Sequence, residues 1–366
     1  MDACATENLT ALTQSVQHNC AISDARHARD YSLCIYLLRM REYYRWAHQL
    51  PLSKSLDVKQ VGDWLTEREQ YWDDIEENEY QPIVIDGEHF DPFATDEINR
   101  KLVPQDLVYS AGIGRMGQPH FALATLLDQQ SDDLSVTYFS GTELARDSIT
   151  VPAMTRGSAL FIRQDGIQRV LWEMYDTWRL KKPPGPMADV VSHYRLSSSQ
   201  SLESNLAAAS SDITSIILAH EQGEFAAAQE LGPEYSSQTL ALAGTHGEFY
   251  LRAVRDLYAD SLSLWPIIVK HSAVHWLDFW LAGLNGIRLK LMEETGLFEK
   301  LSAGSAATRL QLLENLTKTE QQRWYACCQL MLTTYTTNKS THANKVDAMS
   351  VLQPLLQSDA IVAEHP

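Results

Sequence analysis

The feature that most constrains the fold is an apolar stretch in the second half of the chain, Ile267 to Leu284. At about 100° per residue on a helix, His271, His275 and Asp278 fall within roughly a 60° arc. Apolar side chains cover most of the remaining helix surface, whereas an ordinary surface helix has only a limited apolar stripe. The stretch therefore predicts a buried helix with one narrow ionisable seam, and buried ionisable groups need partners.

A second predicted helix also carries ionisable residues on its buried side. Ile213, Ile216 and Ile217 mark its core-facing stripe, and helical spacing extends this stripe to His220 and Glu224. If the two helices face each other, they supply three imidazoles and two carboxylates. Helical bundles build metal sites from inward-facing residues in this way. The donor set suits a divalent transition metal such as iron, manganese or zinc.

The predicted metal site consists of His220, Glu224, His271, His275 and Asp278. It predicts a metal-dependent helical-bundle enzyme with redox chemistry, because these ligands hold Fe(II) while leaving positions open for oxygen or substrate. Two alternatives stay open: a closed hydrogen-bond network without metal, and metal-free acid–base catalysis. Neither the paired ExxH motifs of ferritin-like bundles nor HExxH is present.

The charge balance limits the partners. The chain has 30 Lys and Arg against 47 Asp and Glu, a formal charge of −17. This charge repels phosphate backbones and anionic lipids, so we expect a small-molecule substrate or a protein partner and neither nucleic acid nor membrane. Acidic residues concentrate between Glu67 and Glu79, which we interpret as a solvated helix face. The alternative function is a non-catalytic adaptor or scaffold that docks a protein partner on this acidic surface.

Arginines and tyrosines cluster on the helix that precedes the acidic segment. Arg39, Arg41 and Arg45 occur together with Tyr43 and Tyr44. Such a cluster can bind an anionic ligand. The favoured interpretation is that the arginines form ion pairs with the acidic helix.

The cysteines and the N-terminus indicate the compartment. The five cysteines are odd in number and form no CxxC pair, which argues against a disulfide framework and a zinc knuckle. The N-terminus has no basic or apolar region typical of a secretory signal, and no window of about 18 residues is uniformly apolar. We therefore predict a cytoplasmic protein.

The expected fold class is α+β, with two domains. The N-terminal domain is expected to mix helices with antiparallel β-structure, and the C-terminal domain to be an all-α helical bundle. A Pro- and Ser-rich segment predicts a linker between them. The expected parts are helices over 25–80, short strands over 82–163 and a helix over 165–180 in a first domain of residues 1–180, a linker over 181–203, and a bundle over 204–366.

Capping patterns predict the starts of two helices. Ser23 and Asp24 are expected to cap a helix over residues 25–50. Thr245 and Glu248 have the spacing of a capping box for a helix in the C-terminal half. Both patterns predict local hydrogen bonds to the first turn of a helix.

A glycine-rich segment between two predicted strands allows two interpretations. Gly112, Gly114 and Gly117 match the GxGxxG pattern of dinucleotide-binding loops. Pro119 follows at once, however, and no regular series of alternating strands and helices surrounds the match. A β-hairpin turn is therefore the favoured interpretation, and we expect no cofactor there.

Overall fold

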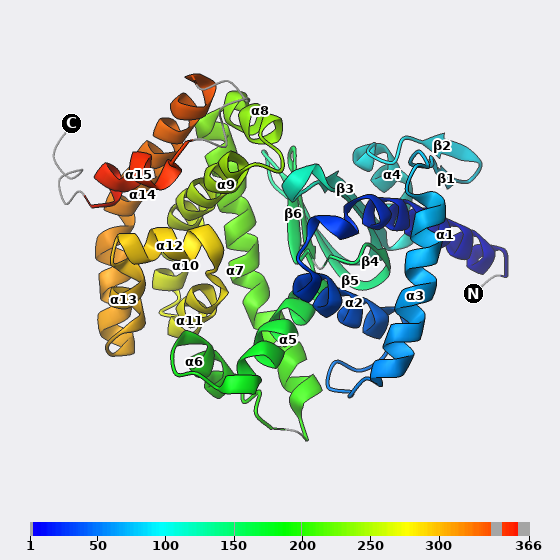
Figure 1. The fold of residues 1–366 in the computed structure, drawn as a ribbon, viewed down its shortest axis with the longest axis horizontal. Helices are drawn as coiled ribbons and strands as arrows, with labels where there is room; N and C mark the ends of the chain where they lie inside the picture. The colour runs from blue at the N-terminus through cyan, green and yellow to red at the C-terminus, as the bar shows by residue number, and fades with distance from the viewer. Residues whose placement is uncertain (1–2, 150, 199, 338–345, 358–366) are drawn as a thin grey trace. The chain divides into compact units, whose positions relative to one another are not determined.

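The computed structural model describes residues 3–149, 151–198, 200–337 and 346–357 (Figure 1). The chain divides into two compact units: the first comprises Met1–Gly114 and Gln118–Trp172, and the second comprises Arg115–Gly117 and Glu173–Pro366. The first unit combines helices with a mixed sheet, and the second is helical. The expected α+β fold class is therefore confirmed.

Four α-helices belong to the first unit: α1 (Ala3–His27), α2 (Leu33–Ala47), α3 (Val58–Ile75) and α4 (Thr95–Leu102). Short 3₁₀ turns, η1 (Ala28–Asp30) and η2 (Val103–Gln105), follow α1 and α4. The Asp57 carboxylate accepts a hydrogen bond from the Gln60 N–H and caps α3. This cap defines the start of α3 at Val58.

The prediction of one helix over residues 25–50 is wrong at its start. α1 continues through Ser23 and Asp24, and α2 begins only after a 3₁₀ turn and an extended stretch. Both predicted caps are buried and make tertiary contacts instead. Ser23 donates to the carbonyl of Pro119, and Asp24 accepts from the N–H and the hydroxyl of Ser148.

A small hairpin and a five-stranded sheet complete the first unit. The hairpin pairs β1 (Ile83–Ile85) with β2 (Glu88–Phe90). The sheet contains β3 (Leu107–Ile113), β4 (Pro119–Ser131), β5 (Val136–Arg146), β6 (Ala153–Arg156) and β7 (Ala159–Arg163), in the order β3-β4-β5-β7-β6. β5 and β7 pair in parallel, and the other neighbours are antiparallel. The parallel pair places Arg163, the last residue of β7, opposite Ser140 of β5.

The glycine-rich segment forms a hairpin turn, as the favoured interpretation predicted. β3 and β4 pair as far as Ile113 opposite Pro119, and a 3₁₀ turn over Arg115–Gly117 joins them. A Cβ atom on Gly114 would lie 2.4 Å from Nε2 of His120, so glycine allows a close approach there. The segment leads into strand β4, whereas a dinucleotide-binding loop would open a helix.

α1 packs against the sheet and also makes polar contacts with the end of β5. Leu12, Val16 and Cys20 lie on one face of α1 and pack with apolar residues of β3, β4 and β5. Gln17 lies beside that face. Its amide donates to the carbonyl of Arg146 and accepts from the Arg146 N–H, which ties α1 to the end of β5.

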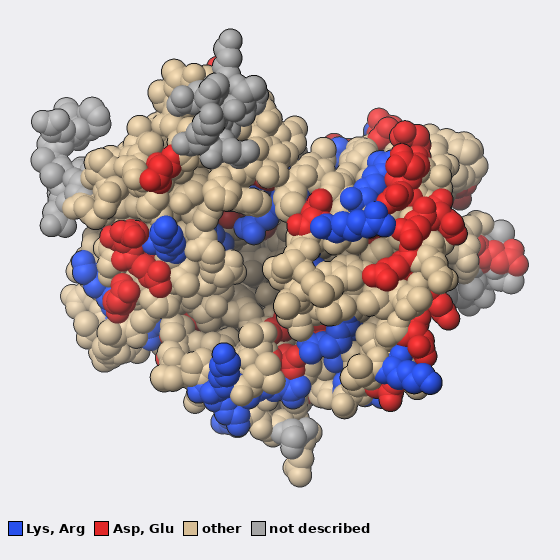
Figure 2. Space-filling model, in the orientation of Figure 1, with Lys and Arg blue, Asp and Glu red and all other residues tan. Residues whose placement is uncertain are grey.

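The acidic segment Glu67–Glu79 lies on α3 and the turn after it. Glu67, Asp74 and Glu77 are exposed, and acidic side chains gather along α3 in the space-filling view (Figure 2). Exposed carboxylates are typical of a solvated helix face. The adaptor function that these charges suggested stays a prediction.

The second unit is built from helices that follow α5 (Gln164–Lys181), which begins in the first unit. They are α6 (Pro186–His193), α7 (Leu202–Leu231), α8 (Pro233–Ala241), α9 (His246–Ala259), α10 (Trp265–Lys270), α11 (Val274–Gly283), α12 (Gly286–Glu294), α13 (Leu297–Ser302), α14 (Ala306–Thr337) and α15 (Ala348–Leu356). A π-helical turn over Asp260–Leu264 joins α9 to α10. The segment 181–203, predicted as a linker, contains α6, and its residue 199 lies outside the described residues.

Two details of the second unit concern predicted helices. Thr245 caps α9, because its hydroxyl accepts from the Glu248 N–H, but the Glu248 carboxylate accepts from the N–H of Gly244 and so does not complete the capping box. The single helix expected over Ile267–Leu284 is wrong, because α10 ends at Lys270 and α11 begins at Val274. Ser272, between them, has a φ of +51°, a left-handed conformation that interrupts a helix. No helix in the described part of the chain is long and apolar enough to cross a membrane.

Candidate functional site

The structure places two of the predicted metal ligands, His220 and Glu224, side by side on α7. Nδ1 of His220 lies 2.6 Å from Oδ1 of Asp260, and Nε2 lies 3.4 Å from Oε1 of Glu224. Burial opposes protonation, but the Asp260 and Glu224 carboxylates raise the pKa of His220 well above its ordinary value. In this arrangement the two carboxylates favour the cationic form of the half-buried His220 imidazole.

Further ion pairs enclose His220. Asp260 accepts from Nε1 of Trp280 at 2.8 Å and from Arg288 at 2.9 Å, whereas Glu224 accepts from Arg255 at 2.7 Å. Although burial opposes the shift, the Arg255 guanidinium lowers the pKa of Glu224. The network contains three cations and three anions, namely His220, Arg255 and Arg288 with Glu224, Asp256 and Asp260. Such a balanced network matches the metal-free alternative that the sequence left open.

The other three predicted ligands lie in different surroundings. Nε2 of His275 is 3.1 Å from Asp212, and Asp278 is paired with Arg309. His271 is exposed in the break between α10 and α11. Within the described ranges, no group of three or more His, Cys, Asp or Glu residues is arranged to hold a metal ion. The predicted metal and redox function stay predictions.

A more distinctive polar site lies in the first unit. Here α1, α2, α3, β5 and the start of α5 surround a cavity of about 660 Å³. This volume is within the usual range of sites for small molecules. The cavity is lined by Thr13, Gln17, Tyr43, Trp46, Ala47, Gln49, Arg68, Thr142, Glu143, Leu144, Asp165 and Arg169.

Aromatic rings form the wall that α2 contributes. Tyr43 and Trp46 stack with centroids 5.5 Å apart and an interplanar angle of 7°. The guanidinium of Arg68 lies 5.8 Å from the Tyr43 centroid and 5.2 Å from that of Trp64. Cation–π attraction therefore holds Arg68 at the cavity. Arg68 forms no ion pair with any residue that the structure describes.

Three guanidinium groups lie around Glu143 of β5, behind this aromatic wall. Its carboxylate accepts from Arg163, lies 3.4 Å from Nη1 of Arg146 and 3.9 Å from Nε of Arg169. The cavity itself is lined by two guanidinium groups, Arg68 and Arg169, and by two carboxyl groups, Glu143 and Asp165. Arg146 and Arg163 lie behind it and pair with the same Glu143 carboxylate as Arg169. The Glu143 carboxylate is therefore shared among three guanidinium groups.

The pKa shifts of Glu143, Arg169 and Asp165 follow from their burial and from the neighbouring charges. Burial opposes ionisation of Glu143, but the guanidinium groups of Arg163, Arg146 and Arg169 lower its pKa. Burial, together with repulsion from Arg146, lowers the pKa of Arg169 to about 10. Burial also raises the pKa of Asp165, which accepts from the N–H of Glu143 at 3.1 Å. Arg169 is therefore a cation that its surroundings neutralise only in part.

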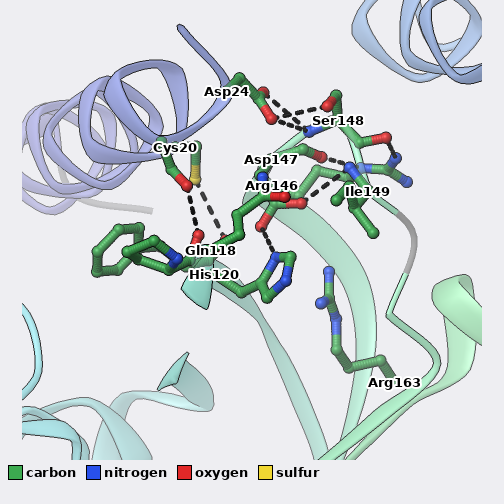
Figure 3. Close-up of polar contacts among 12 residues, drawn as sticks. Cys20, Asp24, Gln118, His120, Arg146, Asp147, Ser148, Ile149 and Arg163 are labelled. Atoms are coloured by element: carbon green, nitrogen blue, oxygen red, sulfur yellow. Dashed lines mark hydrogen bonds and ion pairs between the residues drawn. The ribbon is translucent and has the colours of Figure 1, made fainter. Parts of the chain in front are cut away.

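A buried polar cluster fixes Arg146 from the other side (Figure 3). Nε of Arg146 donates to the carbonyl of Asp147 at 2.9 Å, and Nδ1 of His120 lies 3.0 Å from Oδ2 of Asp147. Ser148 donates to Asp24, and burial followed by repulsion from Asp147 raises the pKa of Asp24 to about 8. All five residues except Ser148 are buried, so the cluster positions Arg146 and is closed to substrates.

Local sequence patterns contain little indication of this site. Glu143, Asp165 and Arg169 occupy no motif, and only the fold brings them to Tyr43 and Arg68. For the arginine and tyrosine cluster of α2, the sequence allows an anion site and favours ion pairs with an acidic neighbour such as α3. Arg41 and Arg45 contact the acidic Glu42 of their own helix, at 2.8 and 3.0 Å.

Comparison with known proteins identifies the family. The model of the DUF6866 N-terminal domain, from a family of unknown function, matches residues 11–163, and the model of its C-terminal domain matches residues 168–352. The chain belongs to this family. No curated protein and no solved structure matches it. Evidence on function therefore comes from the site itself.

Proposed function

We propose that the first unit binds a small anionic ligand in the cavity between α2, α3, β5 and α5. The observation that carries the proposal is the incomplete pairing of the two guanidinium groups that line the cavity. Arg68 lacks an ion pair among the described residues, and Arg169 shares one carboxylate with two other arginines. A phosphate or carboxylate between Arg68 and Arg169 supplies negative charge to two guanidinium groups that the protein pairs incompletely.

Burial strengthens the argument. The Arg169 side chain is 14% exposed, and its Nε makes no hydrogen bond to a described residue. A buried guanidinium without full pairing is unfavourable, because it has lost water without gaining an equal partner. An anion restores charge-assisted hydrogen bonds, and the planar fork of arginine suits phosphate and carboxylate oxygens.

Thermal unfolding in a phosphate-free buffer tests the proposal. Inorganic phosphate, pyrophosphate and sulfate are compared with chloride at equal ionic strength. A ligand at about 100 times its Kd stabilises the native state by about 2.7 kcal/mol. For a unit of this size we expect the Tm to rise by about 5–10 °C with at least one of the oxyanions.

Two variants assign the effect to the cavity. Arg68→Gln and Arg169→Gln should each reduce the rise in Tm, whereas Arg100→Gln should not. Arg100 is exposed on α4, does not line the cavity, and changes the net charge equally. Wild-type protein that responds to no oxyanion beyond chloride would overturn the proposal. So would cavity variants that respond as strongly as Arg100→Gln.

A further inference from the structure

The cavity offers an aromatic surface beside its positive charge. Trp46 is half-buried on α2 and lines the cavity, and Tyr43 stacks against the indole. Indole is a large, flat and polarisable surface, which favours stacking with another planar ring. A half-buried tryptophan at a cavity is therefore suited to hold the flat part of a ligand.

Positive charge surrounds these rings. The Arg146 guanidinium lies 5.6 Å from the Trp46 centroid and 5.8 Å from the Tyr43 centroid, and Arg68 lies 5.8 Å from the Tyr43 centroid. Cations attract the electron-rich faces of aromatic rings. They hold the two rings in place, and they favour an aromatic ligand that carries negative charge over a cationic one.

Polar groups on the other walls of the cavity can bind the edges of such a ring. Thr13 of α1 and Thr142 of β5 provide hydroxyl groups, and Asp165 provides a carboxyl group. Aromatic ligands with ring nitrogens or hydroxyls need such partners at their edges. The volume of about 660 Å³ accommodates one ring with one anionic substituent.

We infer that the ligand is an aromatic anion, whose flat ring stacks on Trp46 while its carboxylate or phosphate binds Arg68 and Arg169. The inference rests on the proposed function and specifies its ligand class. Aryl phosphates, aryl carboxylates and nucleotides share this chemistry. A simple inorganic anion would contact the arginines alone and would not contact the aromatic wall.

Matched pairs of ligands test the inference by isothermal titration calorimetry. Phenyl phosphate is compared with methyl phosphate, and benzoate with acetate, so that each pair differs in the ring and keeps the anionic group. Stacking on one aromatic side chain predicts that the ring-bearing member binds about 5- to 100-fold tighter. Adenosine monophosphate extends the phosphate series to a nucleotide. The pair with the larger difference identifies the preferred anionic group.

Variants of Trp46 assign the preference for a ring to stacking. Trp46→Leu should bring the two affinities of each pair together without weakening methyl phosphate, and Trp46→Phe should retain part of the preference. Trp178→Leu, at another half-buried tryptophan outside the cavity, should leave the preference unchanged. If Trp46→Leu does not fold, the smaller preference expected of Trp46→Phe decides the question.

The outcomes separate the two proposals. Equal affinities for phenyl and methyl phosphate in the wild-type protein would overturn the aromatic inference and leave anion binding intact. A preference for the ring that survives in both Trp46 variants would overturn it as well. If none of the anions binds, the proposed function fails, and the inference fails with it.

Discussion

Replacement of Arg169 by methionine tests whether the cavity contains positive charge that the protein does not neutralise. Methionine keeps an unbranched side chain of similar reach and removes the charge. The pKa of Arg169 falls from 12.5 to about 10, first because of burial and then because of Arg146. A base whose pKa is lower in the folded chain destabilises the native state at every pH at which it is charged. The variant should therefore be more stable than the wild-type protein when no ligand is present.

The magnitude follows from the size of the pKa shift. Each pKa unit corresponds to about 1.4 kcal/mol, so a shift from 12.5 to about 10 disfavours the charged side chain by about 3 kcal/mol at neutral pH. The methionine loses some contacts of the guanidinium with Glu143, which reduces the gain. We expect the free energy of unfolding to rise by about 1–3 kcal/mol, a stabilisation of the kind found when a functional residue is removed.

Urea denaturation in a phosphate-free buffer at neutral pH measures this difference. Arg163→Met is the matched control, because Arg163 donates directly to Glu143 and its side chain is only 3% exposed. Loss of that partner removes the shortest charge-assisted hydrogen bond to a buried carboxylate and should cost about 3–5 kcal/mol. The two variants are thus expected to shift stability in opposite directions. If Arg169→Met lost stability as Arg163→Met does, Arg169 would be neutralised within the protein and the case for a missing anion would fail.

Three further predictions concern the second unit. Glu320 is buried, and burial raises its pKa from 4.5 to about 7, so the wild-type protein loses stability as the pH rises between these values. Relative to pH 4.5, the free energy of unfolding of Glu320→Gln should gain about 3 kcal/mol over that of the wild type above pH 7. A stability difference between the two proteins that does not vary with pH would contradict this. His220→Ala leaves Asp260 short of a cation and should lower the free energy of unfolding by about 3–5 kcal/mol in urea, and a neutral effect would show that the network is not balanced. A Cβ atom on Gly223 would lie 2.2 Å from the carbonyl oxygen of Ala259, so Gly223→Ala should lower stability by about 1–3 kcal/mol, and a variant with unchanged Tm would refute this packing constraint.

The secondary structure was largely predictable from local patterns. The short strands over 82–163 and the helix over 165–180 each occupy the expected region. These elements depend on caps and on periodicity, which are properties of neighbouring residues. The start of α2 was missed because Ser23 and Asp24, good capping residues, are used in tertiary contacts with Pro119 and Ser148 instead.

The candidate site was not predictable in the same way. The prediction of one ionisable seam on Ile267–Leu284 required a continuous helix. The left-handed conformation of Ser272 interrupts that helix. The cavity depends on pairing between β5 and β7, which brings Arg163 to Glu143, and on the position of α5, which brings Arg169. Such convergence of residues far apart in the sequence leaves no periodic pattern.

Calorimetric titration of phenyl phosphate into the wild-type protein and into Arg169→Met tests the central claim most directly. The account predicts saturable binding of one equivalent to the wild-type protein, and loss of that binding in Arg169→Met while the variant stays folded. Absence of binding to the wild-type protein, or equal binding to both proteins, would contradict the assignment of this cavity as an anion site.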